Sequence, residues 1–263
     1  MGSLFVWHSR QIHQTATIAS YIFTQWQSLF NMNQNKTILT NILLLIGILL
    51  GVVLSTLATW ADFESAFYGF TKQAKTPLNG LSCPILIAKD ENQTFSYTIT
   101  NKTGQTISPT VKAEISTPLA PSTSFEFIEL APGESRTFEW KIGPQNIDLE
   151  KFIFAKVLVY SAYPMPDQEN TCGLFVLPVR GNGTLYLIVA SIVSMLCLGS
   201  GGYLGYQANR KMRESRAELF LAALTVVTMT VSFLGLWVQS IFLLAITFLL
   251  IVILFSIRLR QNT

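Results

Sequence analysis

The fold is decided first by residues 38–60, which read ILTNILLLIGILLGVVLSTLATW and contain no Asp, Glu, Lys, Arg or His. About 20 consecutive apolar residues are enough for an α-helix to cross the hydrocarbon core of a bilayer. We therefore predict that this stretch spans a membrane. The whole chain of 263 residues is 50% hydrophobic and 13% charged, a composition typical of a membrane protein.

Three more uncharged apolar stretches follow after a long polar insert, at residues 185–206, 219–237 and 241–257. The last two are separated only by residues 238–240, so they form either a helical hairpin or one long tilted helix, and we favour the hairpin. The predicted fold class is a membrane protein with four transmembrane α-helices and an extracytoplasmic domain inserted between helices 1 and 2.

The distribution of charge predicts the orientation. The insert, residues 61–182, carries thirteen acids and ten bases, whereas the segments outside it carry eight bases and two acids. Lys and Arg collect on the cytoplasmic side of membrane proteins. We therefore expect residues 1–37, the basic loop 207–218 and the tail 258–263 to be cytoplasmic in a plasma or inner membrane. The net charge of +3 reports this topology and gives no argument for nucleic-acid binding.

Aromatic residues mark the ends of the predicted spans. Trp and Tyr are enriched at both membrane–water interfaces, where their rings sit at the level of the headgroups. We expect Trp60, Tyr186 and Trp237 in an outer belt and Tyr203 and Tyr206 in an inner belt.

Small residues recur every four positions on two of the spans, a pattern that lets helix backbones approach closely. We favour packing within the chain's own bundle, with assembly onto another membrane subunit as the alternative. Thr225, Thr228 and Ser232 are expected to add interhelical hydrogen bonds of about 0.6 kcal/mol each. The small residues are Gly47, Gly51 and Ser55 in the first span and Cys197, Gly201 and Gly205 in the second.

The cytoplasmic segment 1–37 places apolar residues at near-helical spacing among polar ones. This pattern predicts an amphipathic helix on the lipid surface. A helix that docks a cytoplasmic partner through Trp7 and Trp26 is one alternative, and a disordered segment is another. The length of this leader and of the apolar span after it favours an uncleaved signal anchor.

The insert changes to a strand pattern after a connector, residues 61–82, that we expect along the headgroups. Residues 95–100 and 137–142 alternate apolar and polar side chains, which is typical of strands with one buried face. Seven short strands separated by turn signals predict an immunoglobulin-like sandwich over residues 83–179. The other five runs are 84–88, 107–116, 124–130, 152–162 and 172–179.

Two of these segments carry a family resemblance. Residues 95–103 read FSYTITNKT and residues 130–140 read LAPGESRTFEW. This succession of strand, Asn turn, strand and PGES hairpin resembles bacterial CARDB-type and related extracellular Ig-like domains. The resemblance implies a β-sandwich, and because such domains serve as spacers, adhesion modules and accessory domains, it implies a fold more than a role.

The three cysteines fit the predicted topology. Cys83 and Cys172 both fall in the extracytoplasmic insert, where an oxidising compartment favours a disulfide between them. Two reduced, reactive thiols are the alternative, although no neighbouring His or Cys-x-x-Cys spacing would activate them. Cys197 lies in the second span and is expected to pack as a small apolar residue.

Histidine content limits the possible chemistry. The chain has only His8 and His13, both on the predicted cytoplasmic side, so the insert holds neither a Ser-His-Asp triad nor a histidine zinc site. We expect no catalytic site, no cofactor and no metal. The carboxylates that a membrane-surface enzyme would need are Glu126, Glu129, Glu139, Asp148 and Glu150.

The predicted spans contain no ionisable residue, which argues against a pump or channel formed by this chain alone. We therefore expect a non-enzymatic accessory subunit that binds a membrane or extracellular protein partner. The alternatives are a regulatory subunit of a transporter or channel and, least favoured, a carboxylate enzyme. Asn92, Asn101 and Asn182 begin Asn-x-Thr triplets and are candidate glycosylation sites.

Overall fold

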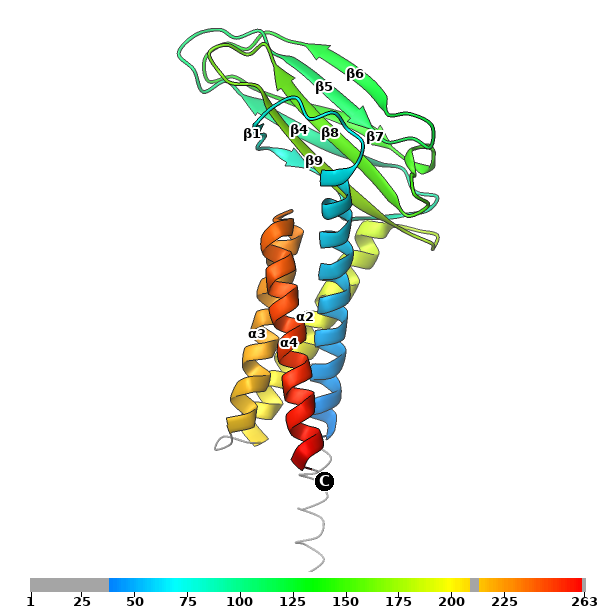
Figure 1. Ribbon diagram of the computed structural model, residues 1–263, viewed down its shortest axis with the longest axis vertical. Helices are drawn as coiled ribbons and strands as arrows, with labels where there is room; N and C mark the ends of the chain where they lie inside the picture. The colour runs from blue at the N-terminus through cyan, green and yellow to red at the C-terminus, as the bar shows by residue number, and fades with distance from the viewer. Residues whose placement is uncertain (1–37, 209–212, 262–263) are drawn as a thin grey trace, which may run out of the picture.

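The computed structural model describes residues 38–208 and 213–261. A helical bundle carries a β domain at one end (Figure 1). The predicted amphipathic segment 1–37, with His8 and His13, lies outside the described residues. The helices are a first helix, Ile38–Phe67, then α2 (Gly183–Ala208), α3 (Arg213–Phe233) and α4 (Trp237–Gln261).

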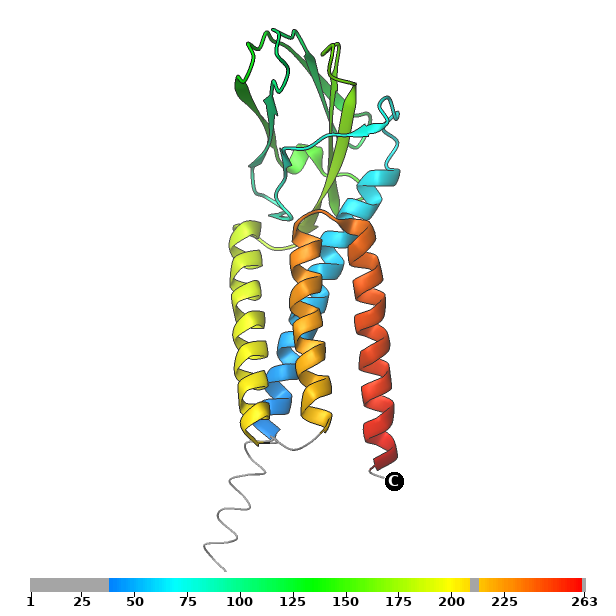
Figure 2. The same cartoon turned by 90° about the vertical axis from the view of Figure 1, so that its left-hand side faces the viewer.

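Among the residues that the structure describes, three helices are long and apolar enough to cross a membrane. They contain the stretches Ile38–Phe67, Gly183–Gln207 and Trp237–Leu254. In α3, which runs from Arg213 to Phe233, the apolar stretch among the described residues is Ala217–Phe233. All four helices nevertheless run side by side beneath the β domain (Figure 2).

A tight turn joins α3 to α4 into a helical hairpin. The turn lies at residues 234–236, where Gly235 has a positive φ of 71° and its N–H donates to the carbonyl of Ser232 at 3.1 Å. Glycine commonly ends a helix in this way because a side chain would be strained in that conformation. Residues 238–240, which we had expected to form the loop, instead belong to α4.

The insert forms nine strands in two sheets. Each of the seven predicted runs contains or overlaps one of the strands β3 to β9, and two further strands of two residues each lie in the expected connector. The larger sheet has the order β1-β9-β8-β5-β6, with β3 also paired to β9, and the smaller has the order β2-β4-β7. Only β1 and β3 pair in parallel, both with β9. The bounds are β1 Thr76–Pro77, β2 Leu81–Ser82, β3 Leu86–Ala88, β4 Gln93–Thr100, β5 Thr110–Ile115, β6 Ser122–Phe127, β7 Ser135–Ile142, β8 Phe152–Tyr160 and β9 Gln168–Leu177.

The two sheets share one hydrophobic core. Alternate side chains of β4 and β7 point into it, as the sequence pattern predicts, and the larger sheet supplies the opposite wall. Phe95, Ile99 and Ile142 from the smaller sheet and Val111 and Leu174 from the larger are all at most 2% exposed.

The two motifs that carry the CARDB resemblance contact each other at one end of the domain. The backbone N–H of Asn101 donates to the carbonyl of Glu134, and that of Gly133 donates to the carbonyl of Asn101, both at 2.9 Å. The Asn101 side chain is fully buried, and its amide nitrogen donates to the carbonyls of Gln105 and Leu130. Asn101 is therefore a structural turn residue whose amide is closed to glycosylation.

Strand β8 is buried on both faces, which explains why its sequence shows no alternation. Ile153 faces the shared core, whereas Phe152 and Phe154 point to the outer face of the larger sheet. The chain that follows the first helix covers this face: the ring of Tyr68 lies 4.4 Å from that of Phe154. This segment crosses the outer face of the sheet and enters β1.

A buried lysine ties the covering segment to the sheet. Lys156 of β8 is 2% exposed, its ammonium donates to the carbonyl of Thr71, and it lies 3.0 Å from a carboxylate oxygen of Glu169. Burial alone would raise the pKa of Glu169, but the N–H of Gln73 and the Lys156 ammonium outweigh it and lower that pKa. The ion pair therefore links the covering segment, β8 and β9.

Candidate functional site

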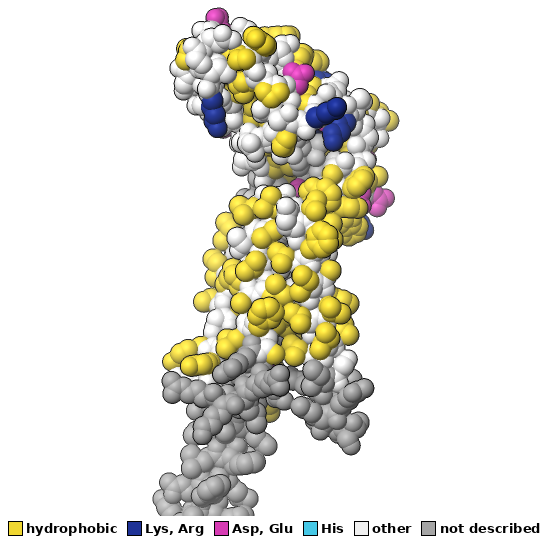
Figure 3. Space-filling view, turned by 60° about the vertical axis from the view of Figure 1, so that its left-hand side comes forward, with side chains coloured by type: hydrophobic (Ala, Val, Ile, Leu, Met, Phe, Trp, Pro, Cys, Tyr) yellow, Lys and Arg dark blue, Asp and Glu magenta, His cyan; other side chains and the backbone are white. Residues whose placement is uncertain are grey.

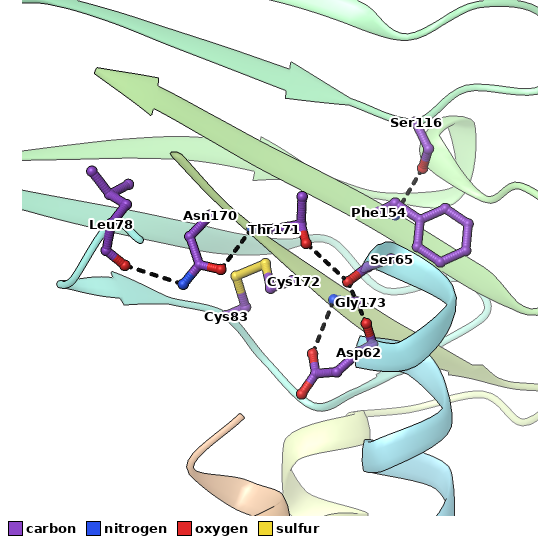
Figure 4. The surroundings of a disulfide bond; sticks show 10 residues. All are labelled: Asp62, Ser65, Leu78, Cys83, Ser116, Phe154, Asn170, Thr171, Cys172 and Gly173. Carbon is purple, nitrogen blue, oxygen red and sulfur yellow. Dashed lines mark hydrogen bonds between the residues drawn. A yellow bond between two sulfur atoms is a disulfide. The ribbon is translucent and has the colours of Figure 1, made fainter. Parts of the chain in front are cut away.

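The first helix meets the β domain in direct backbone contact (Figure 4). A Cβ added to Gly173 of β9 would lie 1.9 Å from the carbonyl oxygen of Ala61, so only glycine allows this approach. The N–H of Gly173 donates to the carboxylate of Asp62 at 3.2 Å, and the Ser65 hydroxyl donates to Thr171 Oγ1 at 3.4 Å. The helix is therefore fixed along β9.

A second contact fixes the start of α2. A Cβ added to Gly183 would lie 2.6 Å from the Cα of Ile87 in β3. The Glu91 carboxylate accepts hydrogen bonds from the N–H groups of Gly183 at 2.7 Å and Ala88 at 2.9 Å. Both helices that flank the insert are thus held by the β domain, which cannot swing freely on flexible linkers.

The contacts of Gly173 with the first helix and of Gly183 with β3 form the joint between the helices and the β domain. Two of the predicted belt residues, Trp60 and Trp237, lie at this joint. The ring of Trp60 lies 5.5 Å from that of Phe152 on the larger sheet. Trp237, at the start of α4, packs against Phe63 and Phe67 of the first helix at 5.8 and 6.4 Å. On the face drawn in Figure 3, apolar side chains cover the helical bundle, and charged side chains lie on the β domain and around the joint. These aromatic rings therefore connect the helices to the β domain, at the level where the membrane–water interface is expected.

The other predicted belt residues are exposed tyrosines on α2. The hydroxyl of Tyr186 donates to the carbonyl of Arg180 at 2.8 Å, near the β domain. Gln207 donates to the hydroxyl of Tyr203 at 2.7 Å near the other end, where Tyr206 also lies. Tyr186 of the predicted outer belt therefore lies at one end of α2, and Tyr203 and Tyr206 of the predicted inner belt lie at the other.

The expected disulfide is present between Cys83 and Cys172. Cys83 directly follows β2 of the smaller sheet and Cys172 lies within β9 of the larger, so the bond crosses between the sheets (Figure 4). Cys197 is a free, half-buried cysteine in α2.

The small-residue stripes pack against each other and against α3 within this chain. A Cβ on Gly47 would lie 2.8 Å from the side chain of Leu198, and one on Gly201 would lie 2.9 Å from Leu44. Gly205 faces Thr40, at 3.2 Å, in the same way. The glycines of both stripes therefore lie against neighbouring helices of this chain.

Hydroxyl groups reinforce this packing. Ser194 of α2 donates to the carbonyl of Gly47 at 2.8 Å, and Ser232 of α3 donates to the carbonyl of Ser55 at 2.8 Å. Ser232 thus makes the predicted interhelical bond. The prediction is wrong for Thr225 and Thr228, whose hydroxyls donate to carbonyls of their own helix at Leu221 and Leu224.

Gly51 provides a test of the bundle. Its added Cβ would lie 2.5 Å from Thr225 Cγ2 and 3.0 Å from Met229 Sδ. We expect Gly51→Val to lower the free energy of unfolding by about 1 to 3 kcal/mol through overpacking, measured by thermal unfolding in detergent. Gly199→Val is the matched control, because nothing lies within 4 Å of its Cβ position. Equal melting temperatures for the two variants would contradict this packing.

The most exposed regular element of the domain is β6, the edge strand of the larger sheet. Five of its six residues are exposed, with Phe125 at 51% and Phe127 at 78%. Its pairing within the described residues is with β5 alone. By contrast, β7 at the edge of the smaller sheet carries Arg136, Glu139 and Lys141, and charged side chains are a usual protection of such edges.

The carboxylates considered for catalysis lie on separate elements. Glu126 is on β6, Glu139 is on β7, and Glu129 is exposed after β6. Asp148 accepts a hydrogen bond from the Tyr68 hydroxyl at 2.5 Å, and Glu150 is exposed in the same loop. Across residues 38–208 and 213–261, no group of three or more His, Cys, Asp or Glu side chains is arranged to hold a metal.

No protein-family profile and no curated protein sequence match this chain. Solved structures match only in part: a cycloisomaltooligosaccharide glucanotransferase of Paenibacillus sp. is 12% identical over 41% of this chain and 15% of its own, with a TM-score of 0.32. The DNA glycosylase AlkC of Pseudomonas fluorescens is 13% identical over 39% of this chain and 30% of its own, with a TM-score of 0.29. A CARDB domain from Pyrococcus furiosus, solved with two metal ions, is 11% identical over 41% of this chain and 98% of its own, with a TM-score of 0.29.

Proposed function

We propose that this protein is a non-enzymatic accessory subunit of a membrane complex, which recruits a protein partner along β6. In this proposal both termini are cytoplasmic and an Ig-like sandwich stands outside a plasma or inner membrane. The excess of basic residues outside the insert supports the orientation. The single observation that carries the function is the exposed edge of β6 with its exposed Phe125 and Phe127.

The chemistry of an edge strand favours a protein partner. Its outward N–H and C=O groups are ready to pair with another strand, a recognition mode in which backbone hydrogen bonds give affinity and alternate side chains give specificity. Phe125 and Phe127 are two residues apart, so they share one face of the sheet. Aromatic side chains of this kind commonly anchor protein interfaces.

The joint supports an accessory role rather than a long-reach adhesive one. Gly173 and Gly183 hold the domain directly on the helices, so β6 lies at a fixed height above the bilayer. Figure 1 draws β6 at the edge of the β domain away from the helices, so a partner that pairs with it would be held at a fixed distance from the bilayer.

A regulatory subunit of a transporter or channel is the second candidate, and α4 is the observation that favours it. Only 11% of its apolar window is buried, and Phe242 and Phe248 are 68% and 66% exposed. A helix so open to its surroundings has room for a second membrane subunit as well as for lipid.

Replacing the two β6 phenylalanines tests the proposal. We expect Phe125→Lys with Phe127→Lys to reduce co-purification of the stoichiometric partner from native membranes by about tenfold or more, the loss of one or two hot-spot contacts. Leu149→Lys is the control, because Leu149 is 59% exposed but lies outside β6. Purification of a lone monomer from wild-type membranes, or full retention of the partner by the double variant, would contradict the proposal.

A further inference from the structure

We propose that the groove between the smaller sheet and the first turns of α2 binds the headgroup of a zwitterionic phospholipid. The groove has a volume of about 950 Å³ and is lined by residues of β4, β7, α2 and the turn between β3 and β4, which include Glu91, Gln93, Lys141, Thr184, Leu185 and Ile188. The inference rests on the membrane location in the proposed function, but it does not depend on the partner at β6.

The groove has a polar end and an apolar end. Gln93 donates to the hydroxyl of Thr184 at 3.0 Å, which joins β4 to the helix at the polar end. At the other end Leu185 and Ile188 of α2 are 58% and 49% exposed. Ile192 continues this face down the helix, 53% exposed. An acyl chain can follow this face into the bilayer while its headgroup stays in the groove.

The height of the groove fits the boundary between water and lipid. It lies where α2 leaves the β domain, in the same helical turn as Tyr186 and at the end of the apolar stretch Gly183–Gln207. Phospholipid phosphates lie at this level in a bilayer, where interfacial tyrosines also collect.

The charges that line the groove are one base and one acid. Lys141 is exposed, and within the described residues it makes no ion pair. The Glu91 carboxylate is fixed by the N–H groups of Ala88 and Gly183 and by the Gln93 amide, which donates to it at 2.6 Å. This pairing matches a headgroup that carries one phosphate and one ammonium: Lys141 would bind the phosphate and Glu91 the ammonium.

The apolar end of the groove favours a lipid over a free phosphate ester. A soluble phosphoethanolamine would satisfy Lys141 and Glu91 but would leave Leu185 and Ile188 uncovered. The acyl chain of a membrane lipid is already in the apolar phase that Leu185 and Ile188 face, so it can pack against them by van der Waals contact, which a free headgroup cannot do. The lipid should therefore bind, whereas the free headgroup should bind weakly or not at all.

Native mass spectrometry of the full chain, titrated in detergent with phosphatidylethanolamine, tests the proposal. We expect Lys141→Gln to weaken binding about tenfold, the usual loss for one charge-assisted hydrogen bond. Lys141→Arg should retain binding. Lys102→Gln is the matched control, because Lys102 follows the opposite end of β4.

Four outcomes overturn the proposal: unchanged affinity in Lys141→Gln, an equal loss in Lys102→Gln, tighter binding of phosphatidylglycerol than of phosphatidylethanolamine, or equal binding of free phosphoethanolamine. An unchanged melting temperature and an intact disulfide show that each variant is folded. Carbonate extraction of membranes and partner co-purification are measured in parallel. A wild-type protein that keeps its partner but does not bind phosphatidylethanolamine would defeat this inference alone, whereas absence of a partner or release of the wild-type protein by carbonate would defeat the proposed function.

Discussion

Replacing Cys83 and Cys172 with alanine should lower the free energy of unfolding of the β domain by about 4 to 5 kcal/mol, the chain-entropy value for a loop of this length. The two cysteines are 89 residues apart in sequence, so their bond restricts nearly the whole unfolded domain. It also joins the smaller sheet to the larger one. We expect the melting temperature of the domain, followed by circular dichroism in detergent, to fall by about 15 °C or more.

Cys197→Ala is the matched control for this loss. Cys197 is half-buried in α2 and forms no disulfide, so its replacement should change the stability of the β domain by less than about 0.5 kcal/mol. Chemical reduction of the wild-type protein should reproduce the behaviour of the double variant. A double variant that unfolds at the wild-type temperature would show that the bond has no stabilising role.

The sequence predicts the strands well where a single face is buried. In β4 and β7 the buried Phe95 and Phe138 alternate with exposed Thr94 and Thr137, so period-two reasoning applies. In β8 it fails, because residues 68–75 cover the outer face and bury both sides of the strand. The period-two pattern of a strand cannot predict that its outer face is buried by a segment about 80 residues away in the sequence.

The connector and the helical turn are harder to predict for local reasons. Strands β1 and β2 have two residues each, too few to show any period. The first helix continues to Phe67, and in this last part Asp62 and Ser65 contact β9 whereas Phe63 and Phe67 pack against Trp237 of α4. For the hairpin, Gly235 was an available signal, since glycine is common just after the end of a helix. The loop was instead predicted at residues 238–240, which include the polar Gln239.

The joint could not be predicted as a contact, although one of its residues carries a signal. Gly173 and Asp62 are 111 residues apart in sequence, and no local pattern pairs them. A glycine inside a predicted strand does indicate close approach of another backbone. The glycine stripes of the helices were predicted because their spacing alone defines a face, which a single strand glycine does not.

Gly173→Ala should separate the β domain from the first helix. The added methyl would lie 1.9 Å from the carbonyl oxygen of Ala61 and 3.0 Å from the backbone nitrogen of Asp62, and backbone atoms cannot turn aside as a flexible side chain can. We expect a loss of about 3 kcal/mol, at the upper end for overpacking, because the hydrogen bond from Gly173 to Asp62 would be broken as well. Thermal unfolding measures the loss, and limited proteolysis between residues 68 and 82 measures the exposure of the covering segment.

The matched control is Gly104→Ala, in the turn after β4, where nothing lies within 4 Å of the added Cβ. It should change stability by less than about 0.5 kcal/mol and leave the covering segment resistant to protease. If the joint carries the domain as a rigid unit, Gly173→Ala should also weaken partner recovery, although β6 itself is unchanged. A Gly173→Ala protein as stable and as protease-resistant as Gly104→Ala would show that the helix and β9 do not meet as described. The fixed height of β6 above the membrane would then have no structural basis.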